Sequence, residues 1–206
     1  MTKEGGCRIF KANSMLKIAH GINTIKQLKN IPLEYGVEID LRADGGRIIL
    51  HHEPFAGGED FTEYLTAYKQ AFIVLNIKEA GIEERVIEIM EARGLADYFL
   101  LDVEFPYLYK ATRAGFKKIA VRYSEAEPIE QALALRDRVE WVWIDTNTDL
   151  PLNKKVVEQL RGFKTCLVSP DRWGRPEDIV PYRKRMEELG FLPDAVMADL
   201  TYLKQW

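Results

Sequence analysis

The chain has 206 residues, of which 47% are hydrophobic and 30% charged, and its formal net charge is -3 at pH 7. A chain of this length forms one domain with a substantial core, or at most two small ones. Its basic residues are not clustered, so the charge pattern gives no support for nucleic-acid binding. No apolar run reaches the ~20 residues that a membrane-spanning helix needs.

The N-terminus and the cysteines bear on domain limits and compartment. The first 14 residues lack the apolar segment of a signal peptide, and Met15 begins the first apolar pattern. We therefore expect residues 1–14 to be an extension outside the fold and residues 15–206 to form one compact domain. Cys7 and Cys166 lie far apart without metal-ligand spacing, which favours a reducing, cytoplasmic setting.

The domain alternates between strands and helical segments. Strands are predicted to begin at eight positions, namely Leu16, Val37, Phe72, Tyr98, Lys118, Trp141, Thr165 and Ala195. Helices are predicted between them, over residues 24–29, 60–70, 81–93, 106–114, 127–135, 154–160 and 177–189. This order predicts a parallel sheet, and eight units predict closure into a (β/α)8 TIM barrel. A doubly wound α/β sheet is the alternative, although no glycine-rich dinucleotide loop follows the first strand.

The second predicted strand carries an unusual row of charges. In the stretch VEIDLR, residues 37–42, apolar side chains alternate with Glu38, Asp40 and Arg42, and side chains on a strand have a period of two. Buried charges need partners or a task. A turn over residues 43–46 and a short apolar strand then lead to His51-His52. We expect the functional site at this hairpin.

Further polar residues gather at the carboxyl ends of the other predicted strands, where barrels of this kind place their active sites. They are His20, Lys78, Asp102, Glu104, Arg122, Asp145, Ser169 and Asp199. On the fourth strand Phe99 and Leu101 are expected to face the helices, which would put Asp102 and Glu104 inside the barrel. On the fifth strand Arg122 is expected to face inward as well. For Asp145, Ser169 and Asp199, and for Asp171 and Arg172 in the following loop, cap or turn roles are favoured.

These side chains suit phosphate chemistry. Two histidines on either side of a substrate can act as base and acid for a displacement at phosphorus. Two carboxylates at alternate strand positions can hold a hard divalent cation, and basic side chains can neutralise a phosphate. The combination favours cleavage of a phosphodiester. The same inventory could serve a metal-dependent sugar-phosphate isomerase or epimerase, or a barrel that binds a ligand without chemistry.

Four stretches resemble the glycerophosphodiester phosphodiesterases and the related phosphatidylinositol-specific phospholipases C. They are AHGINT at 19–24, VEIDLR at 37–42, LHHEP at 50–54 and VLNIK at 74–78, with a weaker likeness in MADLT at 197–201. The resemblance implies cleavage of a small-molecule phosphodiester through a cyclic phosphate, with His20 and His52 as the acid/base pair. It also implies Glu38 and Asp40 as ligands of Mg²⁺ or Ca²⁺. His52 is preferred because His-Glu-Pro matches the family order, and His51 is then expected on the other side of its strand.

The sequence departs from the family pattern at two places. Gly21 follows His20 directly, so the usual Arg-Gly is missing. The third acidic ligand is replaced by Lys78 in one alignment and by Asn76 in the other, which weakens the cation site or lets Lys78 supply the positive charge. Arg42, Lys78 and Arg122 are the candidate phosphate-binding residues, with internal ion pairing as their alternative role.

Overall fold

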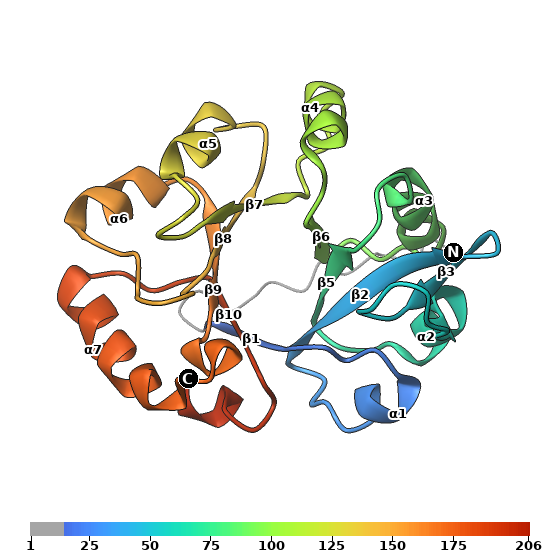
Figure 1. The fold of residues 1–206 in the computed structure, drawn as a ribbon, viewed down its shortest axis with the longest axis horizontal. Helices are drawn as coiled ribbons and strands as arrows, with labels where there is room; N and C mark the ends of the chain where they lie inside the picture. Colours follow the sequence, from blue (N-terminus) through green and yellow to red (C-terminus); the bar gives the residue numbers. More distant parts are fainter. Residues whose placement is uncertain (1–14) are drawn as a thin grey trace, which may run out of the picture.

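The computed structural model describes residues 15–206, and the predicted extension at 1–14 lies outside the described residues. Eight parallel strands form the centre of the fold (Figure 1). In spatial order they are β1 (Leu16–Ala19), β2 (Gly36–Asp44), β5 (Phe72–Ile77), β6 (Tyr98–Leu101), β7 (Ala120–Tyr123), β8 (Trp141–Ile144), β9 (Lys164–Val168) and β10 (Ala195–Ala198). All eight predicted strands are therefore present.

The strands form a ring. Strand β1 pairs with β2 on one side and with β10 on the other, and the ladders continue through the remaining strands. Between β6 and β7 the contact narrows to one bridge, Leu100 to Ile119, where the Leu100 N–H donates to the Lys118 carbonyl at 2.9 Å. With this bridge the pairing runs around the ring, which agrees with the predicted TIM barrel.

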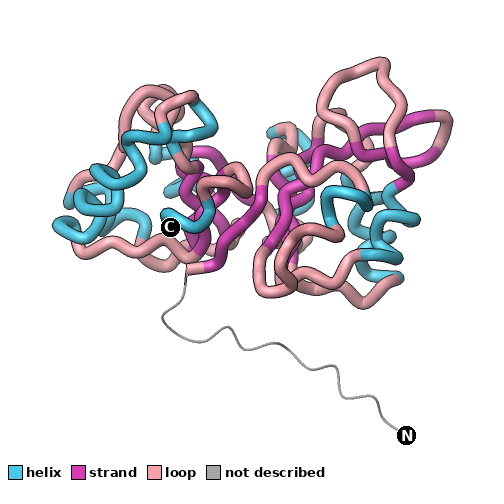
Figure 2. The backbone as a smooth tube through the Cα atoms, turned by 90° about the horizontal axis from the view of Figure 1, so that it is seen from below, coloured by secondary structure: helices cyan, strands magenta, loops and turns pink. Residues whose placement is uncertain are grey.

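The helices lie outside the ring of strands (Figures 1 and 2). They are α1 (Ile25–Leu28), α2 (Phe61–Ala67), α3 (Glu83–Ala92), α4 (Phe105–Arg113), α5 (Ile129–Ala134), α6 (Lys154–Leu160) and α7 (Ile179–Leu189), and a 3₁₀ turn at Leu203–Gln205 follows β10. Each predicted helix is present; α6 has the predicted bounds, and the others have one or both ends shifted. In the described part of the chain, no helix has both the length and the apolarity to cross a membrane.

A hairpin extends strand β2 beyond the ring. Strand β3 (Arg47–Leu50) pairs antiparallel with β2, and β4 (Glu59–Asp60) adds to β3. Gly45 and Gly46, with φ of 55° and 85°, form a two-residue turn that only residues tolerant of positive φ can make. Because such a short turn fixes the pairing, Leu41 lies opposite Leu50 and Asp44 opposite Arg47.

The inside of the ring is filled by apolar side chains at the amino-terminal part of the strands. Trp141 and Trp143 are buried there, and the Trp141 ring lies 4.8 Å from that of Phe99. Phe99 and Leu101 also face the interior, so the expectation that they face the helices is wrong. Above this layer the inward positions become polar, and they form the floor of the candidate site.

Candidate active site

Strand β2 places two carboxylates side by side in the mouth of the barrel. Glu38 and Asp40 are 1% and 2% exposed, and they share one face because they are two residues apart. The Gly21 N–H donates to Glu38 Oε2 at 2.9 Å, and the Asn76 amide donates to Oε1 at 2.8 Å. Neutral donors therefore satisfy both oxygens of Glu38.

Asp40 has one neutral and one charged partner. The Asn23 amide donates to Asp40 Oδ2 at 2.8 Å, while Asn23 Oδ1 accepts the Asp40 backbone N–H at 2.8 Å. The Lys78 ammonium lies 3.3 Å from Asp40 Oδ1 without hydrogen-bond alignment. The parallel pairing of β2 with β5 sets Asp40 beside Asn76. This register agrees with the alignment in which Asn76 replaces the third acidic ligand of the family.

Burial and the neighbouring carboxylate change the protonation of Glu38. Burial, followed by the negative charge of Asp40, raises the pKa of Glu38 to about 7. Hydrogen bonds from Asn76 and Gly21 oppose that shift. Near neutral pH a large share of Glu38 is therefore protonated, which relieves the repulsion between the two groups.

His20 follows strand β1 and contacts two side chains from the other end of the chain. Arg172 Nη2 lies 3.2 Å from His20 Nε2, and Asp199 Oδ1 lies 3.6 Å from Nδ1. Arg172 also donates to Asp199 Oδ1 at 2.7 Å. This arrangement makes Nε2 the acceptor and puts the proton of the neutral ring on Nδ1, toward Asp199. Burial, followed by the charge of Arg172, lowers the pKa of His20 to about 4, so the ring is neutral at physiological pH.

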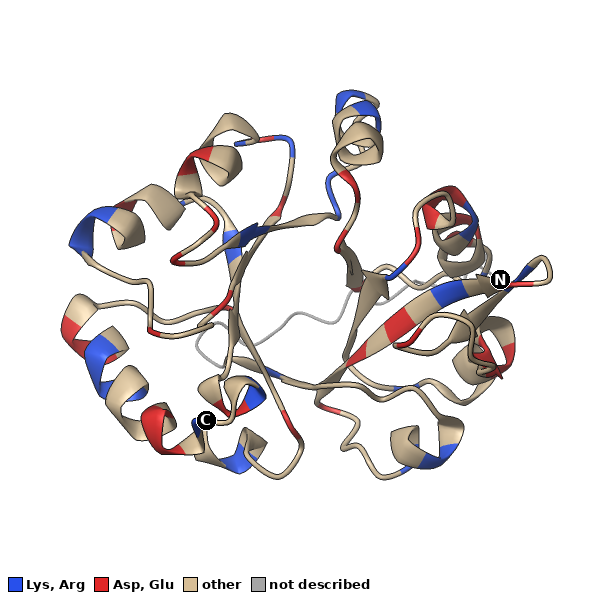
Figure 3. Cartoon of the chain, viewed as in Figure 1, with Lys and Arg blue, Asp and Glu red and all other residues tan. Residues whose placement is uncertain are grey.

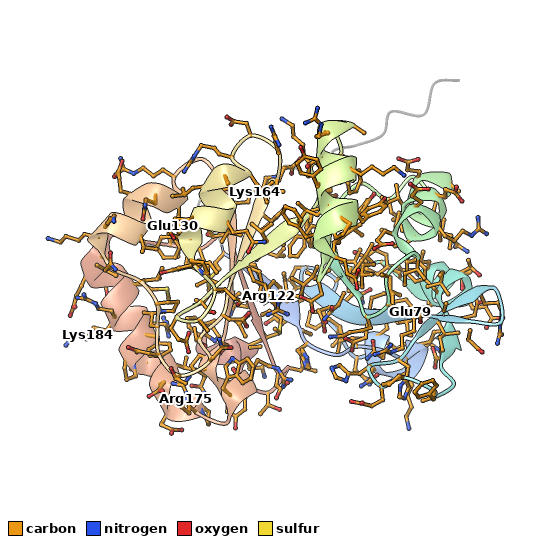
Figure 4. The ribbon with its side chains drawn as sticks, turned by 45° about the horizontal axis from the view of Figure 1, so that its top comes forward. Glu79, Arg122, Glu130, Lys164, Arg175 and Lys184 are labelled. Carbon is orange, nitrogen blue, oxygen red and sulfur yellow. The ribbon has the colours of Figure 1, made fainter. Side chains whose placement is uncertain are left out.

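Across the ring from β2, an arginine holds two carboxylates. Figure 3 shows two acidic bands and one basic band along β2 and a basic band on β7, on the facing side. Arg122 lies toward the middle of the molecule in Figure 4, whereas Lys184 lies at its outer edge. The Arg122 guanidinium makes two bonds to Asp102, at 2.7 and 3.0 Å, and one to Asp145.

The protonation of this cluster follows from its contacts. Burial disfavours the charge on Arg122, but the hydrogen bonds and charge of Asp102 outweigh burial and raise the pKa of the guanidinium. Burial raises the pKa of Asp145 to about 6 against the effect of Arg122, so the carboxylate is ionised at neutral pH. Asp102 reaches this cluster through its left-handed backbone, with φ of 58°, which interrupts the strand alternation after Leu101. Glu104, in contrast, is exposed at the start of α4.

The β2–β3 pairing settles which face His51 occupies. The His51 N–H donates to the Asp40 carbonyl at 3.0 Å, which continues the ladder by one residue beyond Leu41 and Leu50. Directly opposed residues of an antiparallel pair project to the same face. His51 therefore shares the face of Asp40, and the expectation that it points to the other side is wrong.

His51 and His52 differ in their partners. His51 Nδ1 lies 3.0 Å from both the N–H and the carbonyl of Glu53, so the backbone can satisfy the neutral and the protonated ring alike. The His52 side chain is 59% exposed and its Nδ1 pairs with Glu53 Oε1 at 2.7 Å. Both histidines line a cleft with Gly21, Asn23 and other residues of the two loops.

The predicted phosphate-binding residues Lys78 and Arg42 have different contacts in the structure. Lys78 lies 3.8 Å from Asp102 as well as close to Asp40, so it joins the two sides of the mouth. Arg42 instead donates to the backbone carbonyls of His52 and Lys78, at 2.9 to 3.1 Å. Its guanidinium ties the hairpin loop to the end of β5.

Sequence reasoning missed the contacts of Arg172 and Asp199 with His20. Arg172 belongs to a 3₁₀ turn, Pro170–Trp173, as its predicted turn role implied, but its guanidinium also contacts His20. The available signal was position, because residues after the seventh and eighth strands of a barrel open onto the same mouth as His20.

The acidic residues do not fit a hard divalent cation. Both Glu38 oxygens and Asp40 Oδ2 accept hydrogen bonds, and an ammonium lies beside Asp40 Oδ1. Asn76 Oδ1 is buried without a hydrogen-bond partner, but it is a neutral oxygen. Within residues 15–206, no group of three or more His, Cys, Asp or Glu side chains is arranged to hold a metal ion.

Comparison with solved structures shows which barrels this fold resembles. A glycerophosphoryl diester phosphodiesterase from Parabacteroides distasonis superposes with a TM-score of 0.65 at 12% identity, over 94% of this chain and 87% of that one. A glycerophosphodiester phosphodiesterase from Agrobacterium tumefaciens gives 0.65 at 12% identity, over 92% and 99%. No family model matches the sequence, and no curated protein matches it.

The fold is thus a (β/α)8 barrel of the kind found in these phosphodiesterases. At this level of identity the likeness concerns the chain trace, and it extends over nearly the whole of both chains. In fold, the chain therefore agrees with the family that the four short motifs resemble.

Proposed function

We propose that the protein cleaves a small phosphodiester carrying a glycerol or sugar group. The observation that carries this proposal is that two histidines in different settings lie beside the buried carboxylates of β2: His20 Nε2 is 3.8 Å from Glu38, and the His51 backbone pairs with that of Asp40. His20 is neutral and its Nε2 is an acceptor, whereas the Nδ1 of His51 is satisfied by the Glu53 backbone. A base and an acid for one displacement need this asymmetry.

In this mechanism the two histidines move one proton each. His20 Nε2 takes the proton of a hydroxyl next to the phosphate, and that oxygen forms a new bond to phosphorus. His51 Nε2 gives a proton to the leaving alcohol oxygen as its bond to phosphorus breaks. The products are a cyclic phosphate and a free alcohol, and water can then open the ring in the reverse sense.

In this proposal the second histidine is His51. The sequence motif alone favours His52. The reason is the register, which sets His51 on the face of Asp40. His52 is largely exposed and is engaged by the Glu53 carboxylate. Its side chain serves as the matched comparison for His51.

Cations at the mouth suit the phosphate oxygens. The Lys78 ammonium and the Arg172 guanidinium are each about a quarter exposed or less, at 18% and 26%, so they can meet a ligand without full hydration. A phosphate bound beside His20 would take over the hydrogen bond that Arg172 now gives to Nε2. That exchange would leave the nitrogen open to the attacking hydroxyl.

The experiment is phosphorus NMR of the protein with a panel of glycerophosphodiesters. The proposal predicts a cyclic phosphate or a phosphomonoester, and it predicts loss of at least a hundredfold in rate for His20→Ala with unchanged thermal unfolding. Conversion of no diester, or undiminished turnover in His20→Ala, would contradict it. Activity on sugar monophosphates instead would favour the isomerase alternative.

A further inference from the structure

We infer that the Asn76 amide and the Lys78 ammonium take the place of a divalent cation between Glu38 and Asp40, so that this barrel mouth works without a metal. The inference rests on the proposed function only in naming phosphate as the anion that Lys78 meets. Its test, which measures ion binding, does not depend on turnover.

Three of the four carboxylate oxygens of Glu38 and Asp40 already accept hydrogen bonds. A cation ligand must offer a lone pair, yet Glu38 accepts from Asn76 and Gly21 at 2.8 and 2.9 Å. Asp40 Oδ2 accepts from Asn23 at 2.8 Å. These donors come from strand β5 and from the loop after β1, and a metal would compete with them for the same carboxylate oxygens.

Lys78 already places a positive charge beside Asp40. Lys78 Nζ lies 3.3 Å from Asp40 and 3.8 Å from Asp102, between two carboxylates that face the mouth. A divalent ion bound to Asp40 would stand a few ångströms from this ammonium and would be repelled by it. Lys78 thus supplies the charge that the ion would supply.

Backbone hydrogen bonds and burial hold Lys78 in place. The backbone N–H of Lys78 donates to the Leu41 carbonyl at 3.0 Å. The backbone carbonyl of Lys78 accepts from the Arg42 guanidinium at 3.1 Å. With 18% of the side chain exposed, the ammonium has little freedom to leave the site. The backbone contacts between β2 and the end of β5 therefore fix the position from which Lys78 replaces the ion.

The test is Mn²⁺ binding followed by electron paramagnetic resonance, with substitutions that restore the missing ligand. Wild-type protein should leave Mn²⁺ free at millimolar concentration. The double variant Asn76→Asp/Lys78→Met keeps the side-chain sizes and adds a third carboxylate, so it should bind one Mn²⁺ at least a hundredfold more tightly than wild type. Adding Glu38→Gln to that variant should abolish the gain, which places the ion at this site.

Two results would overturn the inference. One is a stoichiometric Mn²⁺ signal in the wild-type protein that Glu38→Gln removes, because the site would then accept a cation as it stands. The other is a folded double variant, judged by circular dichroism and thermal unfolding, that gains no Mn²⁺. In that case residues 76 and 78 would not decide whether a cation binds.

Discussion

The two sides of the barrel mouth hold their carboxylates in different ways. On the β2 side, Glu38 rests on neutral donors alone, and its pKa is raised to about 7. On the β6–β8 side, Asp102 and Asp145 both bond to one guanidinium, that of Arg122. On the first side Glu38 gains and loses its proton near neutral pH, whereas on the second side the carboxylates are held in ion pairs with Arg122.

This difference favours the β2 side as the place of the proposed chemistry. Buried groups whose protonation is near balance are characteristic of active sites, and fully compensated ion pairs are characteristic of structural clusters. The histidines lie with the first side: His20 Nε2 is 3.8 Å from Glu38, and His51 is opposite Asp40. Lys78 connects the two sides.

The largest expected effect is on the ion-paired side. Arg122→Met should lower the free energy of unfolding by about 3–5 kcal/mol, because Asp102 and Asp145 are left without their shared cation. Urea unfolding at pH 7 measures the loss. Arg122→Lys, which keeps the charge but not the fork of donors, should lose less. A change below about 1 kcal/mol in Arg122→Met would show that the cluster is not structural.

A smaller effect is expected for the pH dependence on the β2 side. Since the pKa of Glu38 is raised from 4.5 to about 7 in the folded protein, its stabilising contribution is full below pH 4.5 and is lost as the pH rises through 7. Relative to Glu38→Gln, wild-type protein should therefore lose about 3 kcal/mol of unfolding free energy between pH 4 and 8. Exposed Glu104→Gln is the control and should follow wild type. Parallel pH curves for wild type and Glu38→Gln would contradict the raised pKa.

The smallest expected effect concerns His20. Its pKa of about 4 has burial as the main cause and the charge of Arg172 as the second, so Arg172→Met should raise it without restoring the ordinary value of 6.5. A nitrogen–proton NMR titration of the imidazole from pH 3 to 8 follows this directly. An imidazolium that persists at pH 6 in wild-type protein would rule out a neutral base at rest.

Much of the fold could be predicted from the sequence because each β/α unit is local. The apolar strand runs and the helical spacing repeat along the chain, and the barrel follows from their number and order. Strand parity was less reliable. It placed Glu38, Asp40 and Arg122 correctly, but it put Phe99 and Leu101 on the wrong face, because the left-handed backbone at Asp102 breaks the alternation.

The site was only partly predictable because its contacts join distant segments. The His51 face depends on a two-residue Gly45-Gly46 turn, whereas the sequence suggested a longer one over residues 43–46. The contact of Arg172 with His20 spans 152 positions and depends on how the loop after β9 folds. Residue type and position in the barrel identified the candidates, but only the three-dimensional register paired them.

The most direct test of the central claim compares two neighbouring histidines. Turnover of one glycerophosphodiester is followed by phosphorus NMR for wild type, His51→Ala and His52→Ala, each checked for an unchanged thermal unfolding curve. The pairing of His20 with His51 predicts a loss of at least a hundredfold for His51→Ala and a change within about fivefold for His52→Ala, since general acid–base catalysis contributes about 10²–10⁴ in rate. The opposite pattern, with His52→Ala inactive and His51→Ala active, would contradict the register argument and assign the acid to His52.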